Sequence, residues 1–482
     1  MSYQKHINER GLPMEKIITD IYGIMKHSSN PIETEKKIQN YMWDTFSEIM
    51  GEILEKINQT IKEKKQALGW KVQRNDPRTV QCVFGPVQFN RTLMVDPNGQ
   101  NHYPLDKWLG LKKRQRYSPL VEIQMTELVG DATYRDTADF IKAWTPVEMS
   151  HQTVKSILEK VGEIQGKYDQ SLVEELEESA NLPDGRKLDF FYAEADGVFV
   201  RSTKKGKKLE IHHAITYEGW EKNGERVSLK APKTILTTQS ISKFWEEVQT
   251  LTAFEYSLEN TRVITNSDGG NGYTAEKFQT AFSQSKYPVL NQLDAYHITQ
   301  GLNRTFGTKD DLYKSEVRQA IQEKDMNSFQ LWMDTFESTL EFDQDLEKFE
   351  GFLTYITKNW DRIFDWRKVV EDAPADARRL GAMESNQRRI TFRMKKRGMH
   401  WSQKGCEAMV KVKQGMFNGT LRDAYLADLN RSVRQLREDK KIISASKILH
   451  QKSRPSVGAK QGSIALYAPA SSAMGQLFKS FR

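Results

Sequence analysis

The order of strand-like runs between residues 188 and 300 most constrains the fold of this chain. Three runs come first and are typical of antiparallel strands: "LDFFYAEADGVFV", "LEIHHAITYEGW" and "VSLKAPKTILTT". A helical segment follows, "SISKFWEEVQTLTAFEY". Strand, helix and strand then alternate from "TRVITNSDGGNGY" to "YPVLNQLDAYHI". This order predicts one mixed sheet with helices packed on it, as in ribonuclease-H-like folds.

Aspartates stand at the ends of several of these runs. Asp196 and Asp268 are each followed by glycine, and Asp294 stands three residues before His297. Ligands of open sheets bind beyond strand ends, so acids on neighbouring strands can converge. Convergent carboxylates repel each other, and a hard divalent cation relieves the repulsion. We therefore expect Mg²⁺ (or Mn²⁺), as a pair of ions, with the glycines admitting a phosphate backbone.

Each acid also has a plainer interpretation. A single Asp-Gly at a strand end is usually a turn. A calcium loop starting at Asn266 is excluded, because its twelfth position is Lys277 instead of Glu. Glu194 shares a strand face with Asp196 and is either a ligand or a structural acid. Glu384 is nearly the only acid in a long basic stretch, although a surface helix acid is the default there.

Helical patterns dominate the N-terminal part. Residues 1 to about 70 have apolar positions three and four apart, and residues 79–96 predict a hairpin with Gly85-Pro86 as its turn. Three short helices are then expected to begin after Ser118, Thr133 and Ser150. This is the pattern of a helix-turn-helix, although any small three-helix bundle would look alike.

Charge is concentrated near the C-terminal end. Between Arg378 and Lys460 there are 21 Lys and Arg against 6 Asp and Glu, a net of +15, so the rest of the +8 chain sums to −7. Such a segment favours a polyanion partner, although a solvated helical surface would have the same composition.

Composition excludes some classes of protein. The two cysteines, Cys82 and Cys406, lack a CxxC pattern and cannot form a zinc cluster. No apolar run reaches the roughly 18 residues of a membrane span, and the N-terminus has no apolar signal core. We expect a cytoplasmic, nucleoid-associated protein without membrane contact.

The succession "YAEADG", "NSDGGNGY", "DAYHITQ" and "GAMESNQRRITFRMKKRGMHW" resembles the ISLre2 family of bacterial insertion-sequence transposases, long catalogued as an uncharacterised protein family. The likeness covers the full length, because the N-terminal helices, the hairpin and "SHQTV" fit as well. Asp294-x-x-His297 also resembles the (Cys/Asp)xxH signature of Mutator and hAT-like transposases, which carry a helical insertion before their last Glu.

The resemblance implies a DDE transposase, an enzyme that binds insertion-sequence ends and catalyses metal-dependent DNA cleavage and strand transfer. Asp196, Asp268 and Glu384 would hold two Mg²⁺ ions. His297 would orient a strand or protonate a leaving oxygen, or else would bond Asp294 as structural support. The partners would be double-stranded DNA, as terminal inverted repeats and target, and further copies in a homodimer or larger assembly.

Basic residues after Glu384 are expected to contact DNA. Arg388 lies one helical turn after it, and later residues extend the surface toward phosphates. Trp401 is a candidate for stacking on a frayed base, with a core position as the alternative. With the start of the third N-terminal helix, the predicted DNA-binding residues are His151, Gln152, Lys155, Arg388, Arg389, Arg393, Lys395, Lys396, Arg397 and Trp401.

The expected fold is thus α/β plus α: a ribonuclease-H-like mixed sheet with a helical insertion, preceded by a helical and helix-turn-helix region with a small β-hairpin. The predicted domains are an N-terminal helical region (1–75), a β-hairpin unit (76–110), a helix-turn-helix-like DNA-binding region (111–170), the first part of the catalytic domain (185–300), a helical insertion (301–375), the end of the catalytic domain (376–430) and a basic tail (431–482).

Two other functions use the same parts. A non-catalytic DNA-binding regulator derived from a transposase would bind without cutting. A nuclease or resolvase of the same fold would cut without joining. A glycosidase also needs paired carboxylates, but it has no use for the +15 segment.

Overall fold

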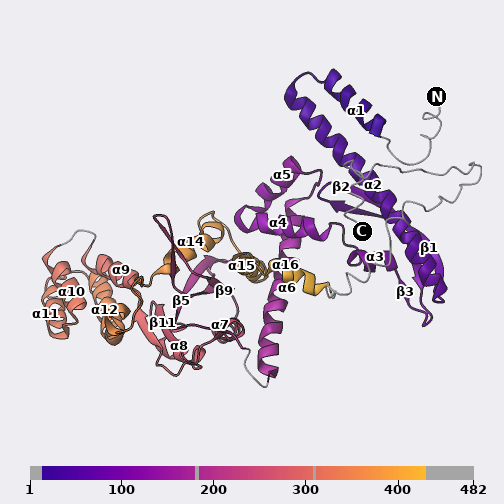
Figure 1. Cartoon of the computed structure of the whole chain (residues 1–482). Coiled ribbons are helices and arrows are strands. Elements are labelled where there is room, and N and C mark those ends of the chain that lie inside the picture. The colour runs from indigo at the N-terminus through magenta and orange to yellow at the C-terminus, as the bar shows by residue number, and fades with distance from the viewer. Residues whose placement is uncertain (1–13, 180–183, 308–310, 430–482) are drawn as a thin grey trace, which may run out of the picture. The chain divides into compact units, whose positions relative to one another are not determined.

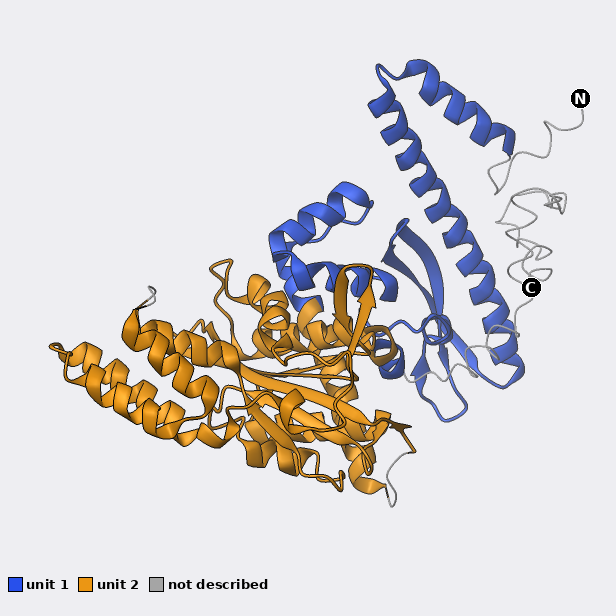
Figure 2. Ribbon diagram, turned by 60° about the vertical axis from the view of Figure 1, so that its left-hand side comes forward, with its two compact units in different colours: residues 1–157, 425–482 blue, residues 158–424 orange. Residues whose placement is uncertain are grey.

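The computed structural model describes residues 14–179, 184–307 and 311–429, so the predicted basic tail 431–482 lies outside the described residues. Over this part of the chain the protein is a mixed α/β structure with sixteen α-helices and four small sheets. It divides into two compact units, residues 1–157 with 425–482 and residues 158–424 (Figure 2). None of the described helices is both long and apolar enough to cross a membrane.

Unit 1 begins with a helical hairpin of α1 (Met14–His27) and α2 (Pro31–Ala67). The start of α2 is set locally, because the side chain of Asn30 accepts a hydrogen bond of 2.9 Å from the backbone N–H of Glu33. Tyr41 donates a 2.9 Å hydrogen bond to Asp20, which joins the two helices. The helical N-terminal region predicted from periodicity is therefore present in the described part.

An antiparallel hairpin follows, made of β1 (Lys71–Cys82) and β2 (Gly85–Val95), with β3 (Asn101–His102) beside β2 and the short helix α3 (Pro104–Leu109) after it. The prediction of Gly85-Pro86 as the turn is wrong. Gly85 pairs with Cys82, and Pro86 pairs with Gln81, so the turn residues are 83 and 84. Proline is tolerated here because it lies at the start of its strand.

The three predicted helices are α4 (Pro119–Asp131), α5 (Tyr134–Trp144) and α6 (His151–Glu178). Each begins after the residue expected from sequence. Ser118 and Ser150 cap the first and third, and Thr133 forms a reciprocal capping box with Asp136. The third helix is 28 residues long, far longer than a recognition helix requires.

A five-stranded sheet forms the centre of unit 2, with strand order β12-β11-β5-β6-β9 (Figure 1). Its strands are β5 (Phe190–Arg201), β6 (Lys208–Tyr217), β9 (Lys233–Thr237), β11 (Arg262–Ser267) and β12 (Leu290–Leu293). β6 is antiparallel to both β5 and β9, whereas β11 is parallel to both β5 and β12. The mixed sheet predicted from the order of the runs is confirmed, but only the second half of the third run, β9, belongs to it, because the first half forms β8 in a separate ladder. Two ladders lie outside it, β4 (Arg186–Lys187) with β10 (Tyr256–Ser257), and β7 (Trp220–Asn223) with β8 (Arg226–Leu229).

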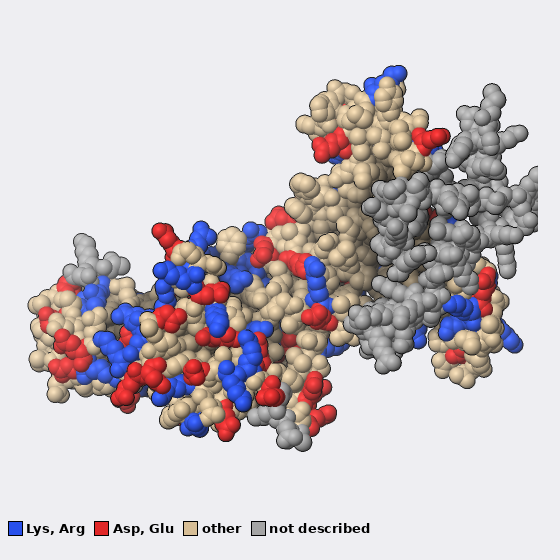
Figure 3. Space-filling model, in the orientation of Figure 1, with Lys and Arg blue, Asp and Glu red and all other residues tan. Residues whose placement is uncertain are grey.

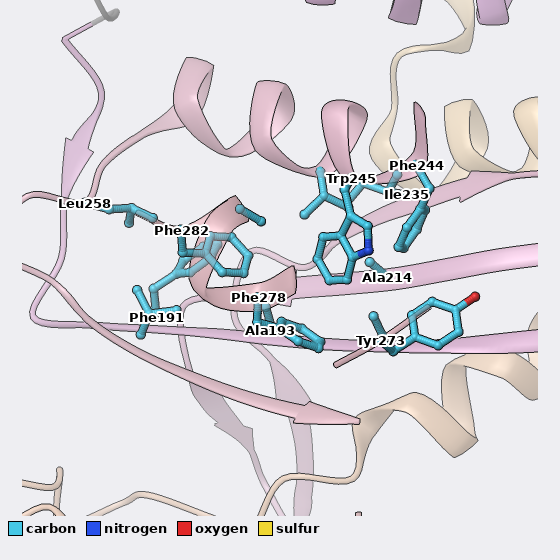
Figure 4. Close-up of a cluster of buried hydrophobic side chains, with 14 of the residues drawn as sticks. Phe191, Ala193, Ala214, Ile235, Phe244, Trp245, Leu258, Tyr273, Phe278 and Phe282 are labelled. Atoms are coloured by element: carbon cyan, nitrogen blue, oxygen red, sulfur yellow. The ribbon is translucent and has the colours of Figure 1, made fainter. Parts of the chain in front are cut away.

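Strand β5 has two different faces because successive side chains point to opposite sides of a sheet. Phe191, Ala193 and Ala195 pack in an apolar cluster with α7 (Ile241–Glu255) and α8 (Ala275–Ala281), through residues such as Phe244 and Phe278 (Figure 4). The alternate residues of β5 face α14 (Ala382–Met394), and two of them are acids. One face is therefore core, and the other carries the polar groups.

The predicted helical insertion is made of α9 (Ala295–Phe306), α10 (Leu312–Glu323), α11 (Met326–Glu337), α12 (Asp343–Lys358), the 3₁₀ helix η2 (Trp360–Arg362) and α13 (Trp366–Val369). The first four pack around an apolar cluster of their own, which includes Leu302, Phe329, Phe349 and Phe352. After α14 the chain forms α15 (Gln403–Asn418) and α16 (Leu421–Asp428).

Candidate acidic site at the strand ends

Three aspartates lie at the same level of three adjacent parallel strands. Asp268 and Asp294 directly follow β11 and β12, whereas Asp196 lies within β5, which continues to Arg201. The prediction that Asp196 ends its strand is therefore wrong, because the pairing with β6 extends β5 beyond it. Ser267 pairs with Ala195, so Asp268 follows at the level of Asp196. Leu293 pairs with Ser267, so Asp294 follows at the level of Asp268. The convergence expected from strand ends is therefore the geometry of the described sheet.

Asp196 is the most perturbed of these acids. Its carboxylate accepts hydrogen bonds from the backbone N–H of Gly197 at 2.7 Å and from the side chain of Gln387 at 2.5 Å. Burial, and then the negative charge of Asp268, raise the pKa of Asp196 to about 6, although both hydrogen bonds and His297 act against the shift. The site thus holds negative charge that the protein only partly compensates.

Glu194 is a structural acid. It is fully buried, and its carboxylate accepts five hydrogen bonds, two of them from Tyr217 (2.8 Å) and Asn266 (3.3 Å). The other three come from the first backbone N–H groups of α14, at residues 381, 382 and 383, over 3.0 to 3.2 Å. Glu194 therefore caps α14 from a neighbouring strand and sets the position and rotation of that helix.

Helix α14 presents Gln387, not Glu384, to Asp196. Glu384 lies in the first turn with an exposed side chain, and no described contact joins it to Asp196 or Asp268. Residues three apart are neighbours on a helix surface, so Glu384 lies one turn before Gln387 on the same side. The structure brings together two of the three predicted triad acids.

His297 faces Asp196. Its Nε2 lies 4.0 Å from Asp196 Oδ2, and its side chain is 29% exposed. The carboxylate of Asp294 accepts a 2.9 Å hydrogen bond from the backbone N–H of Tyr296 and so caps α9. The interpretation of His297 as a side chain bonding Asp294 is therefore not what the structure contains, since only the backbone of His297 reaches Asp294.

The helical insertion holds the loop that carries Asp268. Tyr355 of α12 donates a 2.9 Å hydrogen bond to the backbone carbonyl of Asp268, and Arg362 donates one of 2.7 Å to the hydroxyl of Ser267. A Cβ on Gly269 would lie 2.7 Å from Arg362 and 2.8 Å from Asn359, and the φ of Gly269 is +79°. Glycine is required there because the insertion packs directly on the loop.

A second set of polar residues lies beside the acids and was not foreseen from sequence. Tyr273 ends the glycine loop, and its hydroxyl lies 2.6 Å from Nδ1 of His212. Burial, with Glu210, Asp196 and Asp268, raises the pKa of Tyr273. His213 pairs with Asp196 across the sheet and is fully buried, and burial followed by Arg389 lowers its pKa to about 3. Only the position of Tyr273 directly after the glycines hinted at a role.

The donors present fit a hard divalent cation at the Asp196 and Asp268 pair. Both side chains offer carboxylate oxygens, which Mg²⁺ and Mn²⁺ prefer, and the raised pKa of Asp196 reflects charge that a cation would relieve. Within the described residues, no group of three or more His, Cys, Asp or Glu is placed to hold a metal ion. A complete site would need a further donor.

The predicted DNA-binding residues fall into two classes. Eight have exposed side chains: His151, Gln152, Lys155, Arg388, Arg389, Lys395, Lys396 and Arg397. The other two do not fit the prediction. Trp401 is 4% exposed and donates a 2.9 Å hydrogen bond to the carbonyl of Met394, while the buried Arg393 lies over the Trp401 ring at 5.3 Å. Both belong to the core, where a base or phosphate cannot reach them.

Basic and acidic side chains are interspersed over the face of unit 2 seen in Figure 3. The concentration of positive charge that the sequence shows is therefore not a single uniform patch on that face. Much of it lies beyond residue 429, outside the described residues. Of the predicted basic surface, the described part of unit 2 contains the exposed arginines and lysines of α14 and of the residues directly after it.

Comparison with known proteins gives a family without a stated activity. "UPF0236 protein in vanSb 3'region" of Streptococcus gallolyticus is 32% identical over 414 residues, which cover 85% of this chain and 89% of that protein. A UPF0236 protein of Caldanaerobacter subterraneus subsp. tengcongensis is 23% identical over 417 residues, with 85% and 84% covered. Another from that strain, whose name joins eleven locus designations, is 22% identical over 404 residues, with 82% and 80% covered.

The family model agrees with these relatives. It matches residues 26–427, which include all described elements from the end of α1 to α16. The chain therefore belongs to the uncharacterised protein family UPF0236.

Proposed function

We propose that this protein is a DNA transposase with a ribonuclease-H-like catalytic domain, which cleaves and joins DNA at the ends of its own insertion sequence. The observation that carries the proposal is the convergence of Asp196 and Asp268 on adjacent parallel strands, with the pKa of Asp196 raised to about 6. Two partly buried carboxylates of like charge are costly to hold together, and acids with a perturbed pKa such as Asp196 cluster at functional sites.

The strand order supports the fold assignment. Counting the strands of the central sheet along the chain, β5, β6 and β9 are antiparallel neighbours, and β11 and β12 add on the other side of β5, parallel to it. The order 5-4-1-2-3 is the one we expect for a ribonuclease-H-like sheet. The helical insertion lies between the last strand and α14, as expected from the resemblance of Asp294-x-x-His297 to the signature of Mutator and hAT-like transposases.

A relative's name gives independent support. One UPF0236 protein of Caldanaerobacter subterraneus subsp. tengcongensis carries eleven locus designations in its name. A gene present at several loci of one strain is the outcome expected of a mobile element, and it is unusual for a regulator.

Several side chains have proposed roles in this reaction. Asp196 and Asp268 hold a divalent cation, which when bound supplies charge stabilisation at the reacting phosphate. His297, 4.0 Å from Asp196, donates a proton or a hydrogen bond to a phosphate oxygen. Gln387 orients the carboxylate of Asp196. Glu384 completes the donor set when its side chain turns toward Asp196 from the turn before Gln387.

The test uses DNA fragments made from the sequences that flank the reading frame. Asp268→Ala should reduce Mg²⁺-dependent end cleavage by at least about 10³-fold while binding of the same fragments persists. Asp361→Ala removes an exposed acid of the insertion and is the matched control. Full cleavage by the Asp268 variant would remove that acid from the site.

A non-catalytic DNA-binding protein is the second candidate, and the exposed side chain of Glu384 favours it. Glu384→Gln separates the two. A transposase should lose cleavage in this variant, whereas a regulator would bind the end fragments equally well in both forms and would cut with neither. A nuclease would cleave but would give no joined product in a strand-transfer assay.

A further inference from the structure

Helix α1 carries an apolar stripe that nothing in its own chain buries among the described residues. Met14, Ile18, Tyr22 and Met25 follow one another at spacings of four, four and three, which places them on one side of a helix. Their exposed fractions are 51%, 59%, 67% and 59%. No residue of α1 is fully buried. An isolated helix of about 14 residues is marginal in water, so this one needs a packing partner.

Helix α2 adds a second stripe beside the first. Ile38, Met42 and Phe46 recur every four residues, and Met42 and Phe46 are 50% and 46% exposed. The hydrogen bond between Tyr41 and Asp20 marks the faces by which the two helices meet. At about 100° per residue, the α1 stripe lies about 120–160° around its helix from Asp20, and the α2 stripe lies about 60–140° around its helix from Tyr41. Both rotations lead to the same side of an antiparallel hairpin.

A shallow hollow touches both stripes at the end where the helices are joined. It is lined by Met25 of α1, by residues 28–31 of the turn and by Thr34, Glu35 and Ile38 of α2. Both ribbon views show the two helices joined at this turn, and in Figure 2 they diverge away from it. We call this surface the open side of the hairpin; its residues are Met14, Ile18, Tyr22, Met25, Ile38, Met42 and Phe46. Large contiguous apolar surfaces of this kind mark interaction sites.

We propose that the open side of the hairpin binds the open side of a second copy of this chain, so that two hairpins form a four-helix bundle. A two-helix layer with one apolar side is half of such a bundle, and an identical layer completes it. In a two-fold symmetric pair the same patch serves on both copies, which requires a self-complementary surface.

Charge favours the second copy as the occupant. Glu15 lies at the N-terminal end of α1, and Lys26 lies at its C-terminal end, both at the outer edge of the stripe. When two α1 helices pack antiparallel about their centres, Glu15 of each copy meets Lys26 of the other at both ends. A parallel arrangement would place like charges together, so the antiparallel two-fold pair is selected. The interface does not depend on the proposed DNA chemistry.

Size-exclusion chromatography with light scattering tests the interface on the full chain without DNA. The wild-type protein should have a mass near twice its 55.8 kDa over about a hundredfold range of concentration. The variant Ile18→Lys/Tyr22→Lys should be a monomer, with a dissociation constant at least about 100-fold higher. Leu331→Lys, at a residue that is 63% exposed on α11, is the matched control and should remain dimeric.

Circular dichroism checks that the variants are folded, because substitutions of exposed side chains should leave helix content and melting temperature unchanged.

Crosslinking through Met25→Cys is a second, independent measurement. A short bifunctional maleimide should link two copies through this cysteine, whereas Leu331→Cys should give no covalent dimer. A monomeric wild-type protein would overturn the proposal. So would an Ile18→Lys/Tyr22→Lys variant that stays dimeric, or a Met25→Cys protein that crosslinks no more than Leu331→Cys.

Discussion

Two regions of unit 2 bring carboxylates together, one fully buried and one partly buried, and they pair the charge in different ways. In the buried lysine cluster, Nζ of Lys411 lies 2.5 Å from Glu247 and 3.2 Å from Asp169, and the lysine side chain is 1% exposed. Burial alone would lower the pKa of Lys411, but the two acids more than offset it, and the pKa is raised. At the strand ends, Asp196 and Asp268 face each other without a lysine or arginine bonded to either carboxylate among the described residues.

The difference lies in how the charge is paired. The buried lysine cluster has one cation for two acids, and burial raises the pKa of Glu247 to about 7. Gln165 and Gln414 complete the hydrogen bonds of Asp169 at 2.8 and 2.9 Å. The acid pair is left with excess negative charge, and Arg362 nearby bonds to a hydroxyl rather than to a carboxylate. Asp169 and Glu247 share a cation, whereas the partly buried Asp196 and Asp268 do not, and this contrast is the reason for proposing a cation at the second place.

The largest change in the free energy of unfolding is expected when the buried lysine cluster loses its lysine. Lys411→Met leaves Glu247 and Asp169 buried without their cation and should lower the free energy of unfolding by about 3–5 kcal/mol in urea titrations. Lys404→Met is the control on the same helix, because its contact with Glu159 is 3.7 Å long and 68% exposed on the lysine side, and it should change stability by less than about 0.5 kcal/mol. Equal losses in both variants would contradict a structural role for the cluster.

At the acid pair, removing one charge should raise the free energy of unfolding instead of lowering it. Folding raises the pKa of Asp196 to about 6, so ionisation destabilises the native state above that pH, while the penalty disappears as pH falls toward the ordinary value of 3.8. Asp196→Asn should raise the free energy of unfolding by about 1–3 kcal/mol near pH 7.5 in a chelator, and the gain should vanish near pH 4. A variant less stable than wild type at neutral pH would mean that Asp196 is compensated after all.

Divalent cations should stabilise the protein through the acid pair. At a free Mg²⁺ or Mn²⁺ concentration about ten times its dissociation constant, the gain is about 1.4 kcal/mol, which thermal denaturation detects as a higher Tm. Asp268→Ala should abolish this gain, and Asp361→Ala should keep it. If both variants respond to the cation as wild type does, the ion binds elsewhere.

The smallest change in stability is expected when the insertion loses one of its hydrogen bonds to the loop that carries Asp268. Tyr355→Phe removes one hydrogen bond to the carbonyl of Asp268 and should cost about 1 kcal/mol of stability. Its effect on cleavage should exceed its effect on DNA binding, because the loop positions an acid and not the DNA. Tyr313→Phe, within the insertion but packed on aromatic rings instead of on the loop, should leave cleavage unchanged.

Sequence reasoning was most accurate where structure is local. Helix starts after Ser118, Thr133 and Ser150 were identified because each cap bonds within three residues of itself. The order of strands was also predicted, because alternation and turn residues are local signals. The hairpin turn was misplaced, because a Gly-Pro pair resembles a turn whether it lies in the turn or just after it.

The roles of individual side chains were harder to assign. Asp196 and Asp268 were identified because acids at one level of neighbouring parallel strands lie close together, although Asp196 lies within its strand and not at its end. Arg393 and Trp401 were assigned to DNA by composition, but they lie in the core, since a basic run does not reveal which of its members face inward. Tyr355 and Arg362 had no signal, because they are almost a hundred residues from the loop that they contact.

The sequence alone determined that two aspartates with glycines beside them would lie on neighbouring strands, and that a helical insertion would separate them from the helix that carries Glu384. Only the tertiary structure decided which residue of that helix faces them. Glu194, fully buried on β5, binds the first N–H groups of α14 and fixes its rotation, so that Gln387 reaches Asp196 while Glu384 stays exposed. The rotation of a helix depends on contacts from a strand almost two hundred residues away, and no local pattern encodes it.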